Sequence, residues 1–176
     1  MVLMGRNVIL TGFMGTGKTT VGRAVAGLLG HRFIDTDQII IERHGPIPEI
    51  FERQGEAGFR RYESDVAAEL AGQSDLVIST GGRLMLDDGN ARALETTGDV
   101  FCLHASLDEI LRRVLADHDG PTRPLLAGDD PQARVRNLLA ERAAGYARFR
   151  RVETDGRPPH HIAAEIVGLL QPQQEK

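Results

Sequence analysis

The chain has 176 residues, 41% of them hydrophobic and 26% charged, a composition that fits one folded domain and excludes a disordered chain. Its formal net charge of −4 disfavours a protein whose main role is to bind nucleic acid, and its single cysteine excludes an internal disulfide. The sequence has neither an apolar run of about 18 residues nor a secretory pattern at its N-terminus, so we expect a cytoplasmic protein outside the membrane.

Short apolar runs alternate with helical patterns along the chain. Strands are predicted over residues 7–11, 33–37, 76–79, 100–103 and 152–154. Helices are predicted over residues 18–29, 38–43, 48–54, 56–70, 87–97, 106–116, 131–149 and 160–170. This alternation is typical of an α/β domain in which a parallel sheet is covered on both faces.

Local signals fix two of these boundaries. Ser106 and Glu109 have the spacing of a capping box, in which each side chain accepts a hydrogen bond from the other residue's backbone. The segment 117–128 is polar and contains Gly120 and Pro121, which predicts a loop. There is no internal repeat and no linker, so residues 1–176 are predicted to form a single domain.

Glycine and polar residues gather after three of the predicted strands. They occupy residues 12–19 after the first strand, Asp35 and Asp37 after the second, and Gly81 and Gly82 after the third. In parallel sheets, ligands bind beyond the carboxyl ends of the strands. We therefore expect these three segments to meet at one site.

The first segment, GFMGTGKT over residues 12–19, matches the P-loop motif at every fixed position and lies between a strand and a helix. Such a loop directs backbone N–H groups at phosphate oxygens, and the helix that follows adds its positive end. Lys18 is predicted to reach the β- and γ-phosphates, and the Thr19 hydroxyl to ligate Mg²⁺. Lys18 is also the one lysine inside the chain, since the only other is Lys176.

The second segment, Asp35 to Asp37, allows two interpretations. In an extended strand end, both carboxylates share a face, so that one serves the Mg²⁺ shell and the other orients a substrate hydroxyl and accepts its proton. Alternatively, these residues belong to a turn or cap the helix that begins near Gln38.

Several arginines are candidate anion ligands. Arg60 and Arg61 are neighbours on a predicted helix, so at most one of them faces the site, and both are equally explained as surface partners of Glu56 or Glu63. An arginine within the loop 117–128, Arg123, has the place of a lid residue that neutralises charge on a transferred phosphoryl group. Arg142 is a further candidate.

Taken in this order, the motifs resemble the shikimate kinase family, small P-loop kinases related to nucleoside monophosphate kinases. The resemblance runs from about Asn7 to Leu170. It rests on residues 12–22, 33–37, Ile50-Phe51, Gly55-Glu56, Phe59-Arg60, 80–82, 123–126, Glu141-Arg142 and Tyr146. It implies ATP-dependent phosphorylation of the 3-hydroxyl of shikimate, a step of chorismate and aromatic amino-acid biosynthesis.

The resemblance also implies an architecture. We expect a three-layer α/β/α P-loop kinase fold with a five-stranded parallel sheet in the order 2-3-1-4-5. A mobile lid is expected at about 117–128 and a substrate-binding region at about 37–62. ATP and Mg²⁺ are the implied cofactors, a small hydroxylated carboxylate is the implied partner, and a monomer is the implied state.

Residue roles follow from the same resemblance. The implied catalytic residues are Lys18, Asp37 and Arg123. The implied nucleotide ligands are Gly15, Thr16, Gly17, Lys18, Thr19, Thr20 and Arg113, with Thr19 and Asp35 as metal ligands. The implied substrate ligands are Asp37, Arg60, Gly81, Gly82 and Arg142.

The sequence departs from the family pattern at two places. Arg83 stands where a third glycine is usual, and it would clash with the substrate, point to solvent, or contact a more anionic substrate. Arg113, the match for the arginine that stacks on adenine, lies farther from Arg123 than expected, which leaves Arg112 as the alternative. Three functions therefore stay open: a shikimate kinase, a sibling kinase for another hydroxylated acid, and a nucleotide-binding protein without turnover.

Overall fold

The computed structural model describes residues 5–116 and 130–170. Five parallel strands form one sheet in the order β2-β3-β1-β4-β5. The strands are β1 (Asn7–Gly12), β2 (Arg32–Asp35), β3 (Leu76–Ser79), β4 (Gly98–His104) and β5 (Arg150–Glu153). The expected parallel sheet and its strand order are confirmed.

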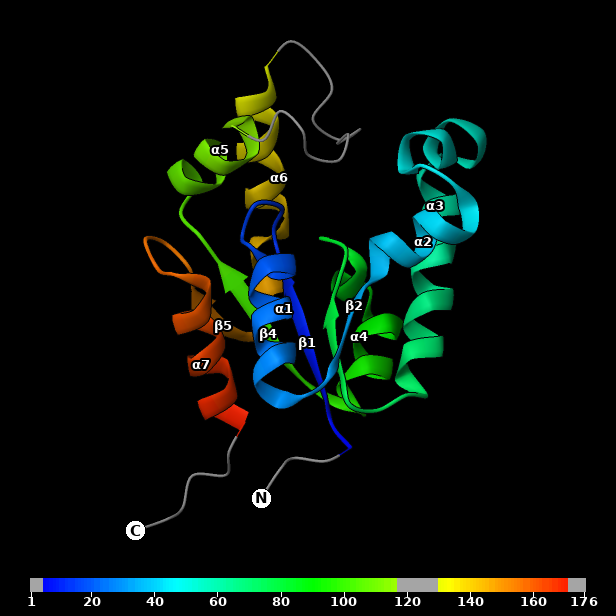
Figure 1. Ribbon diagram of the computed structural model, residues 1–176. Coiled ribbons are helices and arrows are strands. Elements are labelled where there is room, and N and C mark those ends of the chain that lie inside the picture. The colour runs from blue at the N-terminus through cyan, green and yellow to red at the C-terminus, as the bar shows by residue number, and fades with distance from the viewer. Residues whose placement is uncertain (1–4, 117–129, 171–176) are drawn as a thin grey trace.

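Helices cover both faces of this sheet (Figure 1). They are α1 (Lys18–Leu29), α2 (Thr36–His44), α3 (Ile47–Ala71), the 3₁₀ helix η1 (Leu84–Leu86), α4 (Asp88–Glu95), α5 (Leu107–Ala116), α6 (Pro131–Tyr146) and α7 (Pro159–Leu170). Helices α1 and α7 pack together on one face. Side chains of α3, α4 and α6 pack on the other, which gives the three layers that the sequence predicts.

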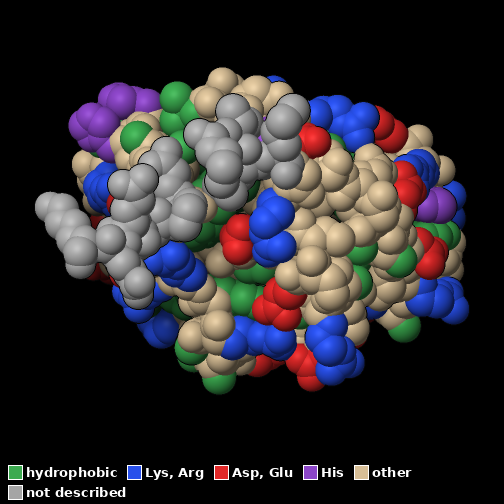
Figure 2. All heavy atoms as spheres, turned by 90° about the horizontal axis from the view of Figure 1, so that it is seen from below, with side chains coloured by type: hydrophobic (Ala, Val, Ile, Leu, Met, Phe, Trp, Pro, Cys, Tyr) green, Lys and Arg blue, Asp and Glu red, His purple; other side chains and the backbone are tan. Residues whose placement is uncertain are grey.

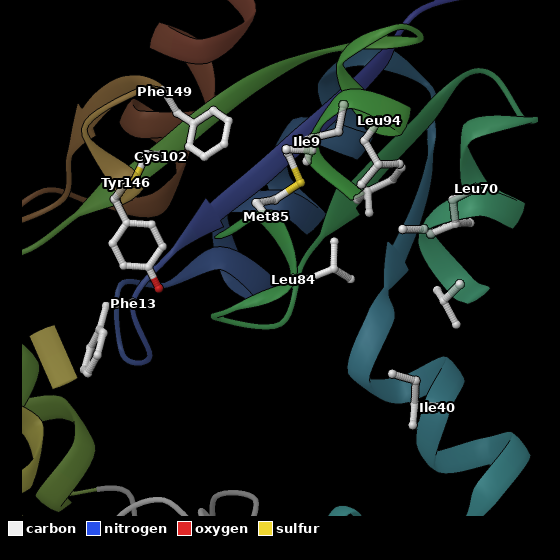
Figure 3. Close-up of a cluster of buried hydrophobic side chains, with 14 of the residues drawn as sticks. Ile9, Phe13, Ile40, Leu70, Leu84, Met85, Leu94, Cys102, Tyr146 and Phe149 are labelled. Carbon is white, nitrogen blue, oxygen red and sulfur yellow. The ribbon is translucent and has the colours of Figure 1, made fainter. Parts of the chain in front are cut away.

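The sheet separates two apolar cores, because successive strand residues point to opposite faces. In β1, Val8 and Leu10 face the core under α1 and α7, whereas Ile9 faces the core under α3 and α4. Figure 3 shows this second core, which extends from Phe149 and Tyr146 through Met85 to Leu70. The strand ends that carry the predicted site are therefore held rigidly from both sides.

The Asp35–Asp37 segment differs from its extended prediction. The strand ends at Asp35, and Asp37 lies in the first turn of α2. The Asp35 carboxylate accepts hydrogen bonds from the backbone N–H groups of Asp37 and Gln38, at 3.1 and 3.4 Å. The helix therefore begins two residues earlier than expected, because Asp35 supplies its N-cap.

The two helices predicted on either side of Gly55 form one continuous run with a kink. Gly55 has φ 68° and ψ −179°, a conformation that interrupts the helix and that glycine adopts at little cost. Residues 47–54 and 56–71 thus form two helical segments whose axes differ in direction at this kink.

Other boundaries shift by a few residues. The capping box is half formed: the Ser106 hydroxyl accepts from the Glu109 N–H at 3.3 Å, but the Ser106 N–H donates to Asp155. The Glu109 carboxylate binds Arg112 and Arg113 instead. Helix α6 ends at Tyr146 and β5 begins at Arg150, and η1 was not predicted at all. The predicted lid at 117–128 lies outside the described residues.

The end of the molecule opposite the β1–α1 loop is a surface of mixed charge. Viewed from below, basic and acidic side chains alternate on it (Figure 2). Arg6, which precedes β1, pairs with Asp99 of β4 at 3.2 Å. Within residues 5–116 and 130–170, no helix is long and apolar enough to cross a membrane.

Candidate active site

The three predicted segments meet at the carboxyl ends of β1, β2 and β3. There they line a cleft of about 770 Å³, to which α3 and α6 also contribute. The predicted site residues that line it are Gly15, Lys18, Thr19, Asp35, Asp37, Arg60, Gly81, Gly82 and Arg142. The lining residues come from the β1–α1 loop and from α2 and α3, whose places in the fold can be followed in Figure 1. The expected convergence of the three segments is therefore present in the structure.

The P-loop is braced by its own side chains. The Lys18 ammonium donates to the carbonyl oxygens of Gly12 and Phe13, at 2.8 and 2.9 Å. The Thr16 hydroxyl also donates to the Phe13 carbonyl, at 2.7 Å. Gly17 has φ 91° and precedes α1 without any side-chain cap, so the first N–H groups of this helix are left for a ligand. Thr20 is exposed on α1 and does not line the cleft.

Thr19 and Asp35 bring two oxygen atoms together. The Thr19 hydroxyl lies 3.1 Å from the second carboxylate oxygen of Asp35, while the first oxygen caps α2. The Asp35 carboxylate can cap α2 with one oxygen and face Thr19 with the other. Both interpretations of Asp35 are therefore compatible with the structure. A hydroxyl and a carboxylate are the oxygen donors that Mg²⁺ prefers, so these residues fit that ion. Among the described residues, there is no cluster of three or more His, Cys, Asp or Glu side chains suited to a metal.

Asp37 projects into the cleft from the first turn of α2. Burial, followed by the charge of Asp35, raises its pKa from an ordinary 3.8 to about 6, although Lys18 and Arg60 act in the opposite direction. One of its carboxylate oxygens is buried and has no hydrogen-bond partner in residues 5–116 and 130–170. A buried acceptor of this kind is poised to receive a hydrogen bond from a ligand.

Glu63 is a buried acid at the site, although its sequence context predicts only a surface partner of Arg60 or Arg61. Its side chain is 2% exposed and accepts a 2.6 Å hydrogen bond from Arg60. Burial raises its pKa to about 7, against the lowering effect of Arg60. The signal that points to it is its spacing, three residues after Arg60 on one helix. Its burial is set by the tertiary packing and is not visible in that spacing.

Gly81 lies between the two acids. A Cβ atom there would come within 2.6 Å of an Asp37 oxygen and 2.8 Å of a Glu63 oxygen, so no larger residue fits without movement. The Gly81 N–H donates to the Thr36 hydroxyl at 2.9 Å, which fixes the loop against α2. The lack of a side chain at Gly81 is therefore required by the two acids, whereas the approach of this loop to a ligand stays a prediction.

Arg142 reaches the cleft from α6. Its side chain is buried, its guanidinium lies 5.7 Å from the centre of the Phe13 ring, and its Nε has no hydrogen-bond partner within the described parts of the chain. Gly82 lies beside it, and the Tyr146 hydroxyl donates to the Gly82 carbonyl. Burial raises the pKa of Tyr146 to about 12, which keeps this hydroxyl a donor.

The match to known proteins decides the family. The sequence model of the family described as shikimate kinase matches residues 14–171, most of the chain. The chain belongs to the shikimate kinase family. The family assignment makes it an ATP-dependent kinase, a phosphotransferase.

Relatives of this family match over nearly the whole chain. A shikimate kinase of Geobacter metallireducens is 41% identical over 168 residues, covering 94% of this chain and 92% of the relative. One of Halorhodospira halophila is 43% identical and covers 94% of each chain. The solved shikimate kinase of Acinetobacter baumannii in complex with shikimate has a TM-score of 0.89 at 36% identity, covering 99% of this chain and 97% of that one.

The departure from the shikimate kinase pattern at Arg83 does not strain the backbone. Arg83 has φ −115° and ψ −10°, which any residue adopts. Its side chain is half-exposed, lines the cleft, and donates to Glu56 at 3.2 Å. Arg83 thus lies at the rim of the cleft, half-exposed to solvent, and its effect on a bound substrate stays a prediction.

The second departure concerns Arg113 and Arg112, which lie in different surroundings. Its guanidinium donates to the Gly15 carbonyl of the P-loop at 3.1 Å and to the Thr154 carbonyl after β5 at 3.3 Å. Arg112 points away, with 68% of its side chain exposed, and pairs with Glu109. Arg113 is thus the one beside the phosphate loop. Arg123 lies outside the described residues.

Proposed function

We propose that this chain transfers the γ-phosphoryl group of ATP to the 3-hydroxyl of shikimate. The observation that carries this proposal is the convergence in one cleft of the P-loop, a buried aspartate with an unpartnered oxygen, and the two arginines Arg60 and Arg142. A small acid that carries both hydroxyl and carboxylate groups needs these three elements together.

The nucleotide side of the cleft would be formed by the P-loop. Backbone N–H groups of Gly15, Thr16 and Gly17, together with the start of α1 at Thr19 and Thr20, face the phosphates. Lys18 exchanges its loop carbonyls for phosphate oxygens. The Arg113 guanidinium, held by the Gly15 and Thr154 carbonyls, would stack on the base.

Thr19 and Asp35 would hold Mg²⁺ through their oxygen atoms. Bound there, the ion neutralises charge on the nucleotide phosphates. Arg123, by its place in the family pattern, would neutralise charge on the phosphoryl group during transfer.

On the acceptor side, Asp37 would act as the base. Its carboxylate accepts the proton of the 3-hydroxyl as that oxygen forms its bond to phosphorus and the bond to ADP breaks. A pKa of about 6 leaves it mostly ionised at pH 7 yet basic enough to accept the proton. Arg60 and Arg142 would bind the carboxylate of the acceptor, the close approach of Gly81 and Gly82 would bound it, and Glu63 would hold Arg60 in place.

The test is the release of ADP from ATP by the purified protein, with and without Mg²⁺, in the presence of shikimate, quinate or gluconate. We expect Mg²⁺-dependent, saturable turnover with shikimate. Lys18→Ala is expected to lose nucleotide binding, whereas Asp37→Asn keeps ATP binding and loses turnover. Asp65→Asn, an exposed aspartate on α3, is the matched control.

A second candidate acceptor is suggested by Arg83, which adds a cation at the cleft rim. Turnover with quinate or gluconate but not shikimate would replace shikimate by another hydroxylated acid. ATP binding without any turnover would leave a nucleotide-binding protein. The monomeric state, the absence of nucleic-acid and membrane partners, and the cytoplasmic location stay predictions from the sequence.

A further inference from the structure

One carboxylate at the rim of the cleft is shared by two arginines. A single oxygen of Glu56 accepts from Arg60 Nη2 at 2.9 Å, from Arg60 Nε at 3.2 Å and from Arg83 Nη1 at 3.2 Å. The hydrogen bonds from Arg60 hold the pKa of Glu56 below its ordinary value, and the charges of Arg83 and Arg142 lower it further. Glu56 is thus an anion of the chain itself, placed among three cationic side chains of the cleft.

Three of the five N–H donors of the Arg60 guanidinium are already used in this arrangement. Its Nη1 donates to Glu63, and its Nε and Nη2 donate to Glu56. The Nε–Nη2 edge is one that binds carboxylates in a bidentate manner. Any carboxylate that enters here must displace one of the two acids.

Glu56 and Glu63 differ in how easily their hydrogen bonds to Arg60 can be broken. Glu63 has 2% of its side chain exposed, so releasing it would strand a buried charge. Glu56 has 44% exposed, so it can move toward solvent at low cost. Glu56 is therefore the one that an incoming carboxylate displaces.

We propose that Glu56 occupies, in the free protein, the edge of Arg60 that the acceptor's carboxylate takes, and that Arg83 retains Glu56 once it has been displaced. Arg83 is thus a positioning residue. This inference rests on the proposed function for the identity of the acceptor. It gives the arginine at the usual glycine position a definite effect on acceptor affinity.

The size of this effect follows from the exposure of the pair. In the free protein Arg83 shares the Glu56 oxygen with Arg60, whereas after displacement it would hold that carboxylate alone, and only this gain affects acceptor binding. Arg83 and Glu56 have 46% and 44% of their side chains exposed, and for such pairs the gain corresponds to about two- to fivefold in an equilibrium constant. Because the phosphoryl transfer atoms are not touched, the effect falls on KM and not on kcat. A direct attraction between Arg83 and the anionic acceptor would also alter KM, so the test must separate the two.

The experiment measures kcat and KM for shikimate in Arg83→Gln, Glu56→Gln and the double variant. We expect R83Q to raise KM about two- to fivefold at unchanged kcat. Arg83→Lys keeps the cation, so its KM is expected to stay near the wild-type value. In the E56Q background, R83Q is expected to leave KM unchanged, because no displaced carboxylate remains to be held. Arg61→Gln, which removes the same charge from an exposed position outside the cleft lining, controls for net charge.

Two results overturn the inference. If R83Q leaves KM unchanged, Arg83 does not act on acceptor binding. If R83Q raises KM equally with and without Glu56, Arg83 acts directly on the acceptor. Thermal melting of each variant verifies that it is folded.

Failure of the proposed function gives a different result. In that case the wild-type protein does not phosphorylate shikimate. If quinate or gluconate is the acceptor, kcat and KM of the same variants are measured with that acid. If none is, NMR titration of the Glu56 carboxyl decides: R83Q must raise its pKa while R61Q does not, and an unchanged pKa in R83Q overturns the pairing.

Discussion

At the scale of single residues, two buried acids titrate in the site, Glu63 with a pKa of about 7 and Asp37 below it. As the proposed base, the Asp37 carboxyl is the one that must be ionised for turnover. Its pKa of about 6 lies close to the working range of an enzyme. Because the protonated acid cannot accept a proton, kcat/KM is expected to fall about tenfold per pH unit below pH 6. A pH profile of shikimate turnover measures this. A profile that stays flat down to pH 5 would show that Asp37 is not the base.

The same carboxyl affects stability. Since its pKa is raised from 3.8 to about 6, the folded state binds this proton more tightly than the unfolded chain, and stability declines as pH rises from about 4 through 6. Asp37→Asn is therefore expected to raise the free energy of unfolding by about 1–3 kcal/mol at pH 8, and by much less at pH 4. Urea denaturation at both pH values measures the difference. An equal gain at both would exclude charge burial as the cause, and Asp65→Asn should show no gain.

Gly81 offers a steric test of the acid pair. Gly81→Ala places a methyl group 2.6 Å from Asp37 and 2.8 Å from Glu63, a strain of about 1–3 kcal/mol. We expect kcat/KM to fall at least about tenfold, because both acids must move. Gly82→Ala, whose methyl group would lie 3.5 Å from its nearest neighbour, is expected to lose much less. Equal losses in steady-state kinetics would mean that contact with the acids is not what matters at Gly81.

These residues also mark what the sequence could and could not predict. The P-loop, Asp35, Asp37, Arg60 and Arg142 were predicted from motifs, and the structure places them in one cleft. The burial of Glu63 was not predicted, because α3 looks amphipathic whichever acid faces inward. The pairing of Glu56 with Arg83 joins residues 27 positions apart and depends on the tertiary fold.

At the scale of elements, the kink in α3 sets the direction of the segment that carries Glu56 and Arg60. Gly55 has φ 68° and nothing within 4 Å of where a Cβ would lie, so its role is conformational and not steric. The boundaries of α1 and β3 match their predictions because glycines and apolar runs delimit them clearly. The start of α2 does not match, because the Asp35 cap outweighs the strand pattern before it.

Gly55→Ala is expected to lower the free energy of unfolding by about 1–3 kcal/mol, since φ 68° with ψ −179° is a backbone conformation that essentially only glycine adopts. The matched control is Gly27→Ala, at an exposed position inside α1 with open space around it, which is expected to stabilise the protein by up to about 1 kcal/mol. Chemical denaturation compares the two. Stabilisation by both variants would show that the kink is not required.

At the scale of the whole molecule, the two cores have different tasks. The core under α1 and α7 lies behind the sheet relative to the acceptor side, while the other core lies directly under Gly81 to Arg83. In the strand order, β2 and β3, whose ends lead to Asp37 and Gly81, lie on one side of β1, and β4 and β5 lie on the other. The alternation of strands and helices predicts the layers, but the strand order itself rested on resemblance to a family.

Leu84→Ala and Ile166→Ala test the two cores separately, because each side chain belongs to a different one. Both side chains are fully buried, in η1 and α7 respectively, so each variant is expected to lose about 2–5 kcal/mol of stability. Only Leu84→Ala is expected to raise KM for the acceptor, because only the cavity that it creates lies under Gly81 to Arg83. Denaturation together with kinetics measures both effects. A rise of KM in Ile166→Ala would mean that the two faces are coupled.

The position of Lys18 also has a consequence for chemical labelling. Apart from the N-terminal amine, an acylating reagent finds only Lys18 and Lys176 in this sequence, and Lys18 lies between the trypsin sites at Arg6 and Arg23. An acylated Lys18 blocks cleavage and leaves residues 7–23 as one peptide, whereas a protected one yields two. Because a bound nucleotide would shield this amine, the ratio of uncut to cut peptide is expected to report how many molecules carry nucleotide, without any turnover being measured.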